Sequence, residues 1–286
     1  MGLFKKKKKR TMEGEERIVV KENSMSSKAE GYNRLTDNIL YLNADGKNKV
    51  IQIESSVSHE GKTTVTCNLA VSLGLTDKKV IVVDLDFRKP RVQQRLGLTI
   101  DNGISEYMLG ELTKDQIIKH SKYKNVDVIT RGAKIYNSSL ILVSDKFKNF
   151  IAELRAEYDY VLLDCAPVLQ VSDYIHIAQV SDGVLFLVAY GSTTRSQVSD
   201  AIKELKKNGA NLLGTVFSMY DRKKDRGYDY YGKGYYGRSY YQAYLEEEQN
   251  EVDTPKDNSQ LEQALGEVER GHTDSIEEID VKETQE

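Results

Sequence analysis

Apolar residues recur along this chain with two different spacings, and the spacing changes several times between residues 29 and 217. Short apolar runs of the kind found in buried strands occur at residues 50–53, 80–85, 126–130, 158–164, 184–188 and 212–217. Between them, apolar side chains three or four residues apart predict helices at 29–42, 64–75, 146–157 and 197–208. Strands that alternate with helices predict an α/β fold, with a mostly parallel twisted sheet and helices on both faces.

A polar turn follows the first predicted strand and leads directly into a predicted helix. Its residues have the order of a phosphate-binding loop: Ser58, His59, Glu60, Gly61, Lys62, Thr63 and Thr64. Backbone N–H groups at a helix N-terminus attract anions, and Gly61 lets the backbone approach a phosphate closely. Lys62 can reach the β- and γ-phosphates, and the Thr63 hydroxyl can bind Mg²⁺. The stretch predicts a nucleotide site on a P-loop NTPase fold, and an ordinary polar strand–helix turn is the simpler alternative.

Acidic residues end two of the later strands. Asp84 and Asp86 follow the run at 80–83, with Arg88 close behind, and Asp164 follows the run at 161–163. The carboxyl ends of parallel strands face the crevice in which open α/β sheets bind ligands. Apolar residues followed by Asp are typical of a Walker B element, whose acid holds Mg²⁺ directly or through water. These carboxylates are therefore expected at the nucleotide site.

Charge is strongly segregated along the 286 residues, although the net charge is only −3. Residues Lys5–Arg10 are all basic, whereas residues 246–286 carry 15 acidic side chains against three basic ones. We expect residues 1–28 to form a basic disordered segment, 29–220 the folded domain, 221–245 a tyrosine-rich tail and 246–286 an acidic disordered tail. No apolar run approaches the roughly 20 residues that span a bilayer, and the two cysteines have no metal or redox spacing, so a cytoplasmic location is expected.

The basic segment follows Met-Gly-Leu-Phe, so two apolar side chains lie beside six cations. Such a segment is attracted to an anionic membrane surface by roughly 1 kcal/mol per basic residue. A peripheral position at the inner face of the membrane is one prediction. A solvated charge run, or weak affinity for nucleic acid, is the alternative.

Tyrosines are concentrated in the segment 221–245, where glycine, lysine and arginine separate them. The cluster consists of Tyr228, Tyr230, Tyr231, Tyr235, Tyr236, Tyr240, Tyr241 and Tyr244. The apolar residues of this segment recur with neither the two-residue period of a strand nor the 3.6-residue period of a helix. This predicts a low-complexity segment rather than a packed element.

The chain contains, in order, the loop at 56–64, the Asp-Leu-Asp-Phe-Arg sequence at 84–88, the strand that ends at Asp164 and a tyrosine cluster. In this order of motifs it resembles the bacterial tyrosine kinases. More narrowly, it is similar to the cytoplasmic kinase subunit of capsular and exopolysaccharide synthesis in Gram-positive bacteria. The resemblance implies an ATP- and Mg²⁺-dependent protein-tyrosine kinase. It implies catalytic roles for Lys62, Asp84, Asp86 and Arg88, and a metal site at Thr63, Asp86 and Asp164.

The resemblance also implies what the kinase acts on and with. It would phosphorylate the eight tyrosines of its own cluster and regulate the synthesis and export of capsular or extracellular polysaccharide. Its partners would be a transmembrane activator of the polysaccharide co-polymerase type, further copies of itself in an oligomer, and a cognate tyrosine phosphatase. A basic tail that had docked in an acidic site would be repelled once phosphorylated, because each phosphate adds about −1.5 to −2 charges.

The sequence departs from the family at several positions. His59 stands where the family has a glycine that permits φ > 0, and Ser218 stands where an asparagine usually lies near the adenine. In the first helix, Arg34 is displaced by one residue from the Glu-x-x-Arg-x-x-Arg pattern of the family's oligomers, which turns its side chain by roughly 100° from the position that pattern gives.

Three other functions remain as alternatives. A positioning ATPase of the MinD/ParA type would have a lysine early in the loop, where this chain has Val57. A kinase-like scaffold of weak activity would explain the departures from the family. A tyrosine- and arginine-rich segment can also stack on single-stranded nucleic acid, but the acidic tail behind it argues against that function, so no nucleic-acid partner is expected.

Overall fold

The structure, a computed structural model, describes residues 18–22, 24 and 26–220. The basic segment Lys5–Arg10, the tyrosine cluster and the acidic tail lie outside the described residues. Within the described part, the strands form one seven-stranded sheet: β1 Val50–Ser55, β2 Val80–Asp84, β3 Lys119–His120, β4 Val126–Ile129, β5 Tyr160–Asp164, β6 Gly183–Ala189 and β7 Leu212–Ser218.

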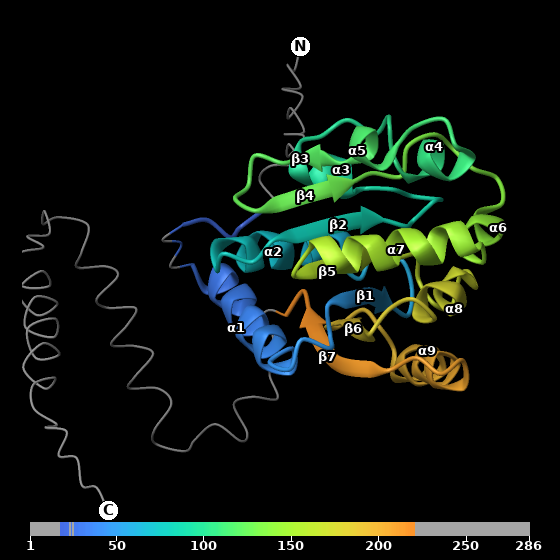
Figure 1. Cartoon of the computed structure of the whole chain (residues 1–286). Coiled ribbons are helices and arrows are strands. Elements are labelled where there is room, and N and C mark those ends of the chain that lie inside the picture. Colours follow the sequence, from blue (N-terminus) through green and yellow to red (C-terminus); the bar gives the residue numbers. More distant parts are fainter. Residues whose placement is uncertain (1–17, 23, 25, 221–286) are drawn as a thin grey trace, which may run out of the picture. The chain divides into compact units, whose positions relative to one another are not determined.

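The strand order is β3-β4-β2-β5-β1-β6-β7, so the crossovers place β1 in the interior of the sheet (Figure 1). Every neighbouring pair is parallel except β3 and β4, which pair antiparallel at one edge. The predicted α/β fold with a mostly parallel sheet is confirmed. All residues of β1, β2, β5 and β6 are buried, which explains the continuous apolar runs of β2, β5 and β6.

Helices cover both faces of the sheet, as predicted. They are α1 Ser27–Leu42, α2 Lys62–Leu75, α3 Val92–Leu96, α4 Ile104–Leu109, α5 Lys114–Ile117, α6 Ser138–Leu142, α7 Asp145–Glu157, α8 Asp173–Ala178 and α9 Arg195–Lys207. Side chains of α1, α2 and α3 pack with Ile51, Ile53 and Val82 on one face, whereas α7 packs with Val50, Ile81 and Val83 on the other (Figure 1). The side chains of α9 pack against β6. The short α8 was not predicted, because six residues show too little helical periodicity.

Strand pairing brings the predicted acidic residues together. Asp84 ends β2 and Asp164 ends the adjacent β5, where their Cα atoms are partners in the register. On its other side β5 pairs with β1, which leads into the phosphate-binding loop. Two acidic strand ends and the loop therefore share the carboxyl edge of the sheet, the position that parallel α/β sheets use for ligands.

The N-terminal end of the described chain differs from the prediction. Ile18 and Val20 are buried in the core beside α2, and the backbone N–H of Val19 donates to Asn68 Oδ1 at 2.8 Å. The expectation that all of residues 1–28 are disordered is therefore wrong for Ile18–Val20. This apolar triplet was too short to give a periodic signal, but two of its side chains belong to the core cluster that also contains side chains of α1 and α2.

Candidate active site

The phosphate-binding loop connects β1 to α2, and two of its residues have left-handed backbone conformations. Gly61, the N-cap of α2, has φ 91°, and His59 has φ 70°. Glycine adopts such angles freely, whereas a residue with a side chain loses about 1–2 kcal/mol there. The geometry confirms the prediction that His59 occupies a position suited to glycine.

Glu60 stabilises the loop through hydrogen bonds of its carboxylate and its backbone carbonyl. Its Oε2 accepts the backbone N–H of Val57 at 2.7 Å, its Oε1 accepts the hydroxyl of Thr193, and its backbone carbonyl accepts the hydroxyl of Ser218 at 2.5 Å. The carboxylate is buried and is absent from the lining of the cavity described below. Glu60 therefore shapes the loop and ties it to the segments that follow β6 and end β7.

Lys62 lies beneath the loop at the start of α2. It is 8% exposed, and its Nζ donates to the Ser55 hydroxyl at 2.8 Å. A phosphate oxygen is a stronger, charged acceptor than this hydroxyl. Because Lys62 also lines the cavity, its ammonium is placed to exchange the hydroxyl for an anion bound there.

Thr63 and Asp164 meet beside Lys62. The Thr63 hydroxyl donates to Asp164 Oδ2 at 2.7 Å, and the Thr66 hydroxyl donates to Asp164 Oδ1 at 3.2 Å. Burial raises the pKa of Asp164, while the Thr63 hydrogen bond and the Lys62 charge oppose that rise. A buried carboxylate next to a hydroxyl is a donor set that suits Mg²⁺. Among the described residues, no group of three His, Cys, Asp or Glu side chains is arranged to hold a metal.

Asp84 is fully buried and its carboxylate organises the loop after β2. Oδ1 accepts the N–H of Asp86 at 3.1 Å, and Oδ2 accepts the N–H groups of Arg91 and Val92, both at 3.1 Å. Burial and the neighbouring Asp164 carboxylate raise the pKa of Asp84 well above its usual range. Asp84 thus lies under the site, with both oxygens engaged by backbone groups.

Asp86 and Arg88 differ in their access to the site. Asp86 lines the cavity, and its Oδ1 accepts the N–H groups of Lys89 at 2.8 Å and Arg88 at 3.2 Å. Arg88 itself is exposed and is not among the described residues that line the cavity. The structure therefore brings Asp86, Lys62 and Thr63 to one cavity and leaves Arg88 outside it.

The cavity at the loop has a volume of about 330 Å³. Its described lining residues are Ser58, His59, Gly61, Lys62, Thr63, Thr64, Asp86, Lys89, Arg91, Arg95, Pro167 and Met219. Four of these side chains are cationic and one is a carboxylate. The expectation of an acidic site is therefore wrong: Asp84 and Asp164 lie buried beneath it, and lysine and arginine side chains form its walls.

Sequence reasoning missed five lining residues, namely Lys89, Arg91, Arg95, Pro167 and Met219. Lys89 and Arg91 follow the paired acids in the connection from β2 to α3, and Arg95 lies within α3. Their position behind Asp86 was the available signal. Met219 follows β7 and has φ 58°, an uncommon angle for a residue with a side chain. No sequence pattern marks it.

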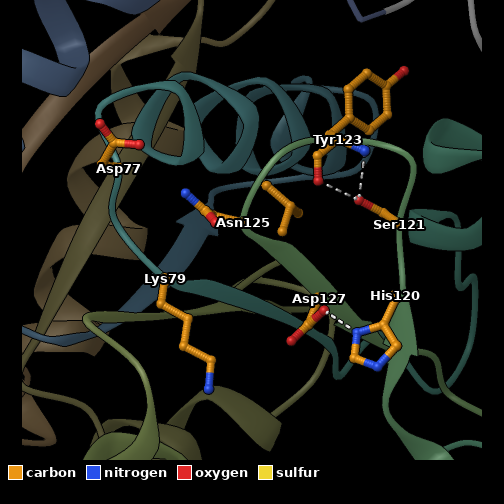
Figure 2. A pocket seen from close by; sticks show the side chains of 8 residues that line it. Asp77, Lys79, His120, Ser121, Tyr123, Asn125 and Asp127 are labelled. Carbon is orange, nitrogen blue, oxygen red and sulfur yellow. Dashed lines mark hydrogen bonds and ion pairs between the residues drawn. The ribbon is translucent and has the colours of Figure 1, made fainter.

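A second pocket, of about 420 Å³, lies at the opposite ends of β2 and β4 (Figure 2). Figure 2 shows His120 and Asp127 pointing toward one another, and His120 Nδ1 lies 2.7 Å from Asp127 Oδ1. Asp77 and Lys79 lie on the other side of this pocket. Acidic and basic side chains alternate around this second pocket. It also lies at the amino ends of the strands, whereas ligands of parallel sheets bind at the carboxyl ends. The loop cavity is therefore the candidate active site.

None of the helices in the described chain combines the length and the apolar character that a membrane span requires.

Residues 48–213 match the family model described as an AAA domain. Among curated proteins, the chain is 32% identical over 207 residues to the tyrosine-protein kinase YwqD of Bacillus subtilis, an alignment that covers 72% of this chain and 87% of that protein. It is 28% identical over 214 residues to the putative tyrosine-protein kinase CapB of Staphylococcus aureus, with 75% and 94% covered.

Two solved structures are also similar. The chimerical protein CapA2B2 matches with a TM-score of 0.67 and 28% identity, covering 71% of this chain and 89% of that one. The septum site-determining protein MinD of Pyrococcus horikoshii, complexed with Mg-ADP, matches with a TM-score of 0.54 and 25% identity, covering 62% and 72%.

Proposed function

The chain belongs to the bacterial tyrosine-protein kinases, and on that basis we propose that it transfers the γ-phosphoryl group of ATP to the tyrosines of its own segment 221–245. The protein is a protein-tyrosine kinase with a P-loop NTPase fold. The observation that carries the proposed site is that Lys62 and Thr63 line the cavity, while Asp164, buried beneath it, is joined to Thr63 by a 2.7 Å hydrogen bond.

The proposed reaction forms a bond between the tyrosine oxygen and the γ-phosphorus and breaks the bond from that phosphorus to the β,γ-bridging oxygen. ADP carries away the leaving oxygen, and the phenolic proton must be accepted, because a tyrosine hydroxyl has a pKa near 10. Mg²⁺ would supply charge neutralisation at the phosphates. The chain's own residues then position the reactants and move the proton.

We propose that Asp86 accepts the phenolic proton of the tyrosine, because it is the carboxylate that lines the cavity. Asp84 instead positions this residue, since its Oδ1 accepts the Asp86 N–H. Lys62 would bind the phosphates, and Thr63, Asp86 and Asp164 would hold Mg²⁺. Ser58, His59, Glu60, Gly61 and Thr64 would complete the nucleotide loop, with Glu60 acting through its internal hydrogen bonds. Arg88 is exposed, so any part it plays would be outside the cavity.

The cavity wall nearest the phosphate-binding loop includes an apolar side chain. Met219 follows β7 and lies close to Gly61 of the loop. Met219 is continuous with Tyr220, whose ring forms an edge-to-face pair with Tyr190 at 5.1 Å between centroids.

The proposed setting of the kinase follows from its relatives. The name of the chimerical protein, CapA2B2, combines CapA with CapB. The curated relative CapB is a putative tyrosine-protein kinase. We propose that this chain acts in the regulation of capsular or extracellular polysaccharide synthesis, with a transmembrane activator of the co-polymerase type, a cognate phosphatase and further copies of itself. The basic segment Lys5–Arg10 would hold it at the inner, anionic surface of the membrane.

A MinD-like switch is the weaker alternative. The structural match to MinD has the lower TM-score, and Val57 stands where such proteins carry their additional lysine. A scaffold without activity is also less favoured, because Lys62, Thr63 and Asp164 retain the contacts expected of a working site.

Phosphotyrosine detection tests the proposal. The full chain is incubated with Mg²⁺ and ATP beside a chain that ends after Tyr220, and we expect a signal only on the full chain. Lys62→Ala should abolish the signal, because no other residue supplies an ammonium at that place in the loop. The matched control is Lys206→Ala, an exposed lysine in the last turn of α9. Phosphotyrosine that persists in Lys62→Ala would refute the assigned site.

A further inference from the structure

The loop from β2 to α3 carries basic side chains that the chemistry proposed above does not use. Lys89 and Arg91 both line the cavity beside Asp86, and both are exposed. They lie next to the carboxylate that would receive the tyrosine proton. A substrate tyrosine that reaches Asp86 therefore lies close to these two cations.

The backbone that carries the two cations is held firmly. The N–H of Lys89 donates to Asp86 Oδ1 at 2.8 Å, and the N–H of Arg91 donates to Asp84 Oδ2 at 3.1 Å. Pro90 between them has a fixed φ. The Arg131 side chain also donates to the carbonyl of Phe87 at 3.3 Å. The same acids that organise the active site therefore fix the positions from which Lys89 and Arg91 extend.

The tyrosine segment has a charge that does not suit this basic entrance. Residues 221–245 contain six basic and three acidic side chains, and their tyrosines include the adjacent pairs Tyr230–Tyr231, Tyr235–Tyr236 and Tyr240–Tyr241. An unmodified segment is repelled by the cations. A single phosphate adds about −1.5 to −2 charges and offers oxygens that arginine binds in pairs and lysine binds as a point charge.

We propose that Lys89 and Arg91 bind the phosphate of a phosphotyrosine that neighbours the acceptor, so that modification of one tyrosine of a pair favours modification of the other. This inference rests on the proposed kinase function and names the substrate preference of the same site. Glycine flanks the pair Tyr235–Tyr236 on both sides, so a bound peptide can turn to present one ring to Asp86 and the other to the cations. Phosphorylation of the segment would then accelerate as it proceeds.

Two peptides test this preference on the full chain. Both contain residues 233–239 with Tyr236 as the acceptor; in one Tyr235 is phosphorylated, and in the other it is replaced by phenylalanine. With saturating Mg²⁺ and ATP, we expect kcat/KM for the phosphorylated peptide to be higher by about tenfold, the effect of one or two charge-assisted contacts. Lys89→Gln and Arg91→Gln should each lower this ratio toward one, whereas Lys206→Gln should leave the ratio unchanged.

The outcomes separate this inference from other roles of the cations. A ratio near one in the unmodified protein overturns it. The inference is also overturned if the ratio of kcat/KM between the two peptides is unchanged in Lys89→Gln and Arg91→Gln while the KM for ATP rises. In that case the two cations would bind the nucleotide and not the peptide phosphate.

Binding gives a readout that does not depend on turnover. Fluorescence anisotropy of the two labelled peptides, with Mg²⁺ and ADP present, should show tighter binding of the phosphorylated peptide, and Lys89→Gln should remove the difference. Equal binding of both peptides overturns the inference even if the kinase is active. Absence of phosphate transfer together with tighter binding of the phosphorylated peptide would count against the proposed function and for this recognition site.

Discussion

Glu54 gives a prediction whose size follows directly from its surroundings. It lies in β1, one residue before the phosphate-binding loop begins to turn, and it is fully buried. Gln52 Nε2 donates to Glu54 Oε1 at 2.7 Å, and Oε2 has no hydrogen-bond partner among the described residues. Burial raises the pKa of Glu54 from 4.5 to about 8, against the opposing effects of Gln52 and the Lys62 charge.

The sign of the effect on stability follows from proton binding. Between pH 4.5 and 8 the folded protein keeps the Glu54 proton, whereas the unfolded chain has released it. Raising the pH therefore favours unfolding, by about 1.4 kcal/mol per pH unit for this one group. At pH 7 the cumulative loss amounts to about 3 kcal/mol, and it grows until the pH passes the folded pKa.

Glu54→Gln removes this dependence because glutamine does not ionise. The added N–H donors need acceptors, and an unsatisfied donor costs about 1–3 kcal/mol, so the net change at pH 7 is a small gain or none. The pH dependence is the sharper quantity. The free energy of unfolding of the variant, measured relative to the unmodified protein, should increase by about 4 kcal/mol from pH 5 to pH 8.

Urea unfolding of the full chain, followed by circular dichroism at several pH values with EDTA and no nucleotide, measures this difference. Glu111→Gln, at an exposed position, is the matched control and should run parallel to the unmodified protein. If Glu54→Gln also runs parallel between pH 5 and 8, Glu54 is ionised in the folded state and the reasoning fails.

Three further predictions concern the site and its supports. Asp164→Asn should raise the stability of the nucleotide-free protein at neutral pH, because burial raises the pKa of this carboxyl. The same variant should abolish the Mg²⁺-dependent thermal shift with ADP. An undiminished shift would contradict the assignment of Asp164 to the metal site. Deletion of residues 1–20 should lower the free energy of unfolding by several kcal/mol relative to deletion of residues 1–17, since burial of Ile18 and Val20 contributes about 1.5–3 kcal/mol each; equal stabilities would show that this segment does not pack. His59→Gly should raise stability by up to about 1 kcal/mol because it relieves the positive φ, and a loss of stability in urea unfolding would argue that the imidazole makes a favourable contact.

The part of the site that could be predicted is the part that lies next to secondary structure in the sequence. Lys62 and Thr63 begin α2 directly after the loop, and Asp164 is the last residue of β5, so local patterns place all three. The division of labour between Asp84 and Asp86 could not be predicted. They are two residues apart, and only the path of the backbone after β2 buries one and brings the other to the cavity.

The sequence by itself determined the α/β fold, the position of the phosphate-binding loop and the family, because alternating apolar runs and a contiguous loop are local properties of the chain. The tertiary structure alone decided that Lys89, Arg91 and Arg95 line the site while Asp84 and Asp164 lie buried beneath it, and that Ile18 and Val20 belong to the core. Both outcomes depend on which strands become neighbours and on what space the helices leave between them. Such contacts join residues far apart in the sequence, where no periodic pattern records them.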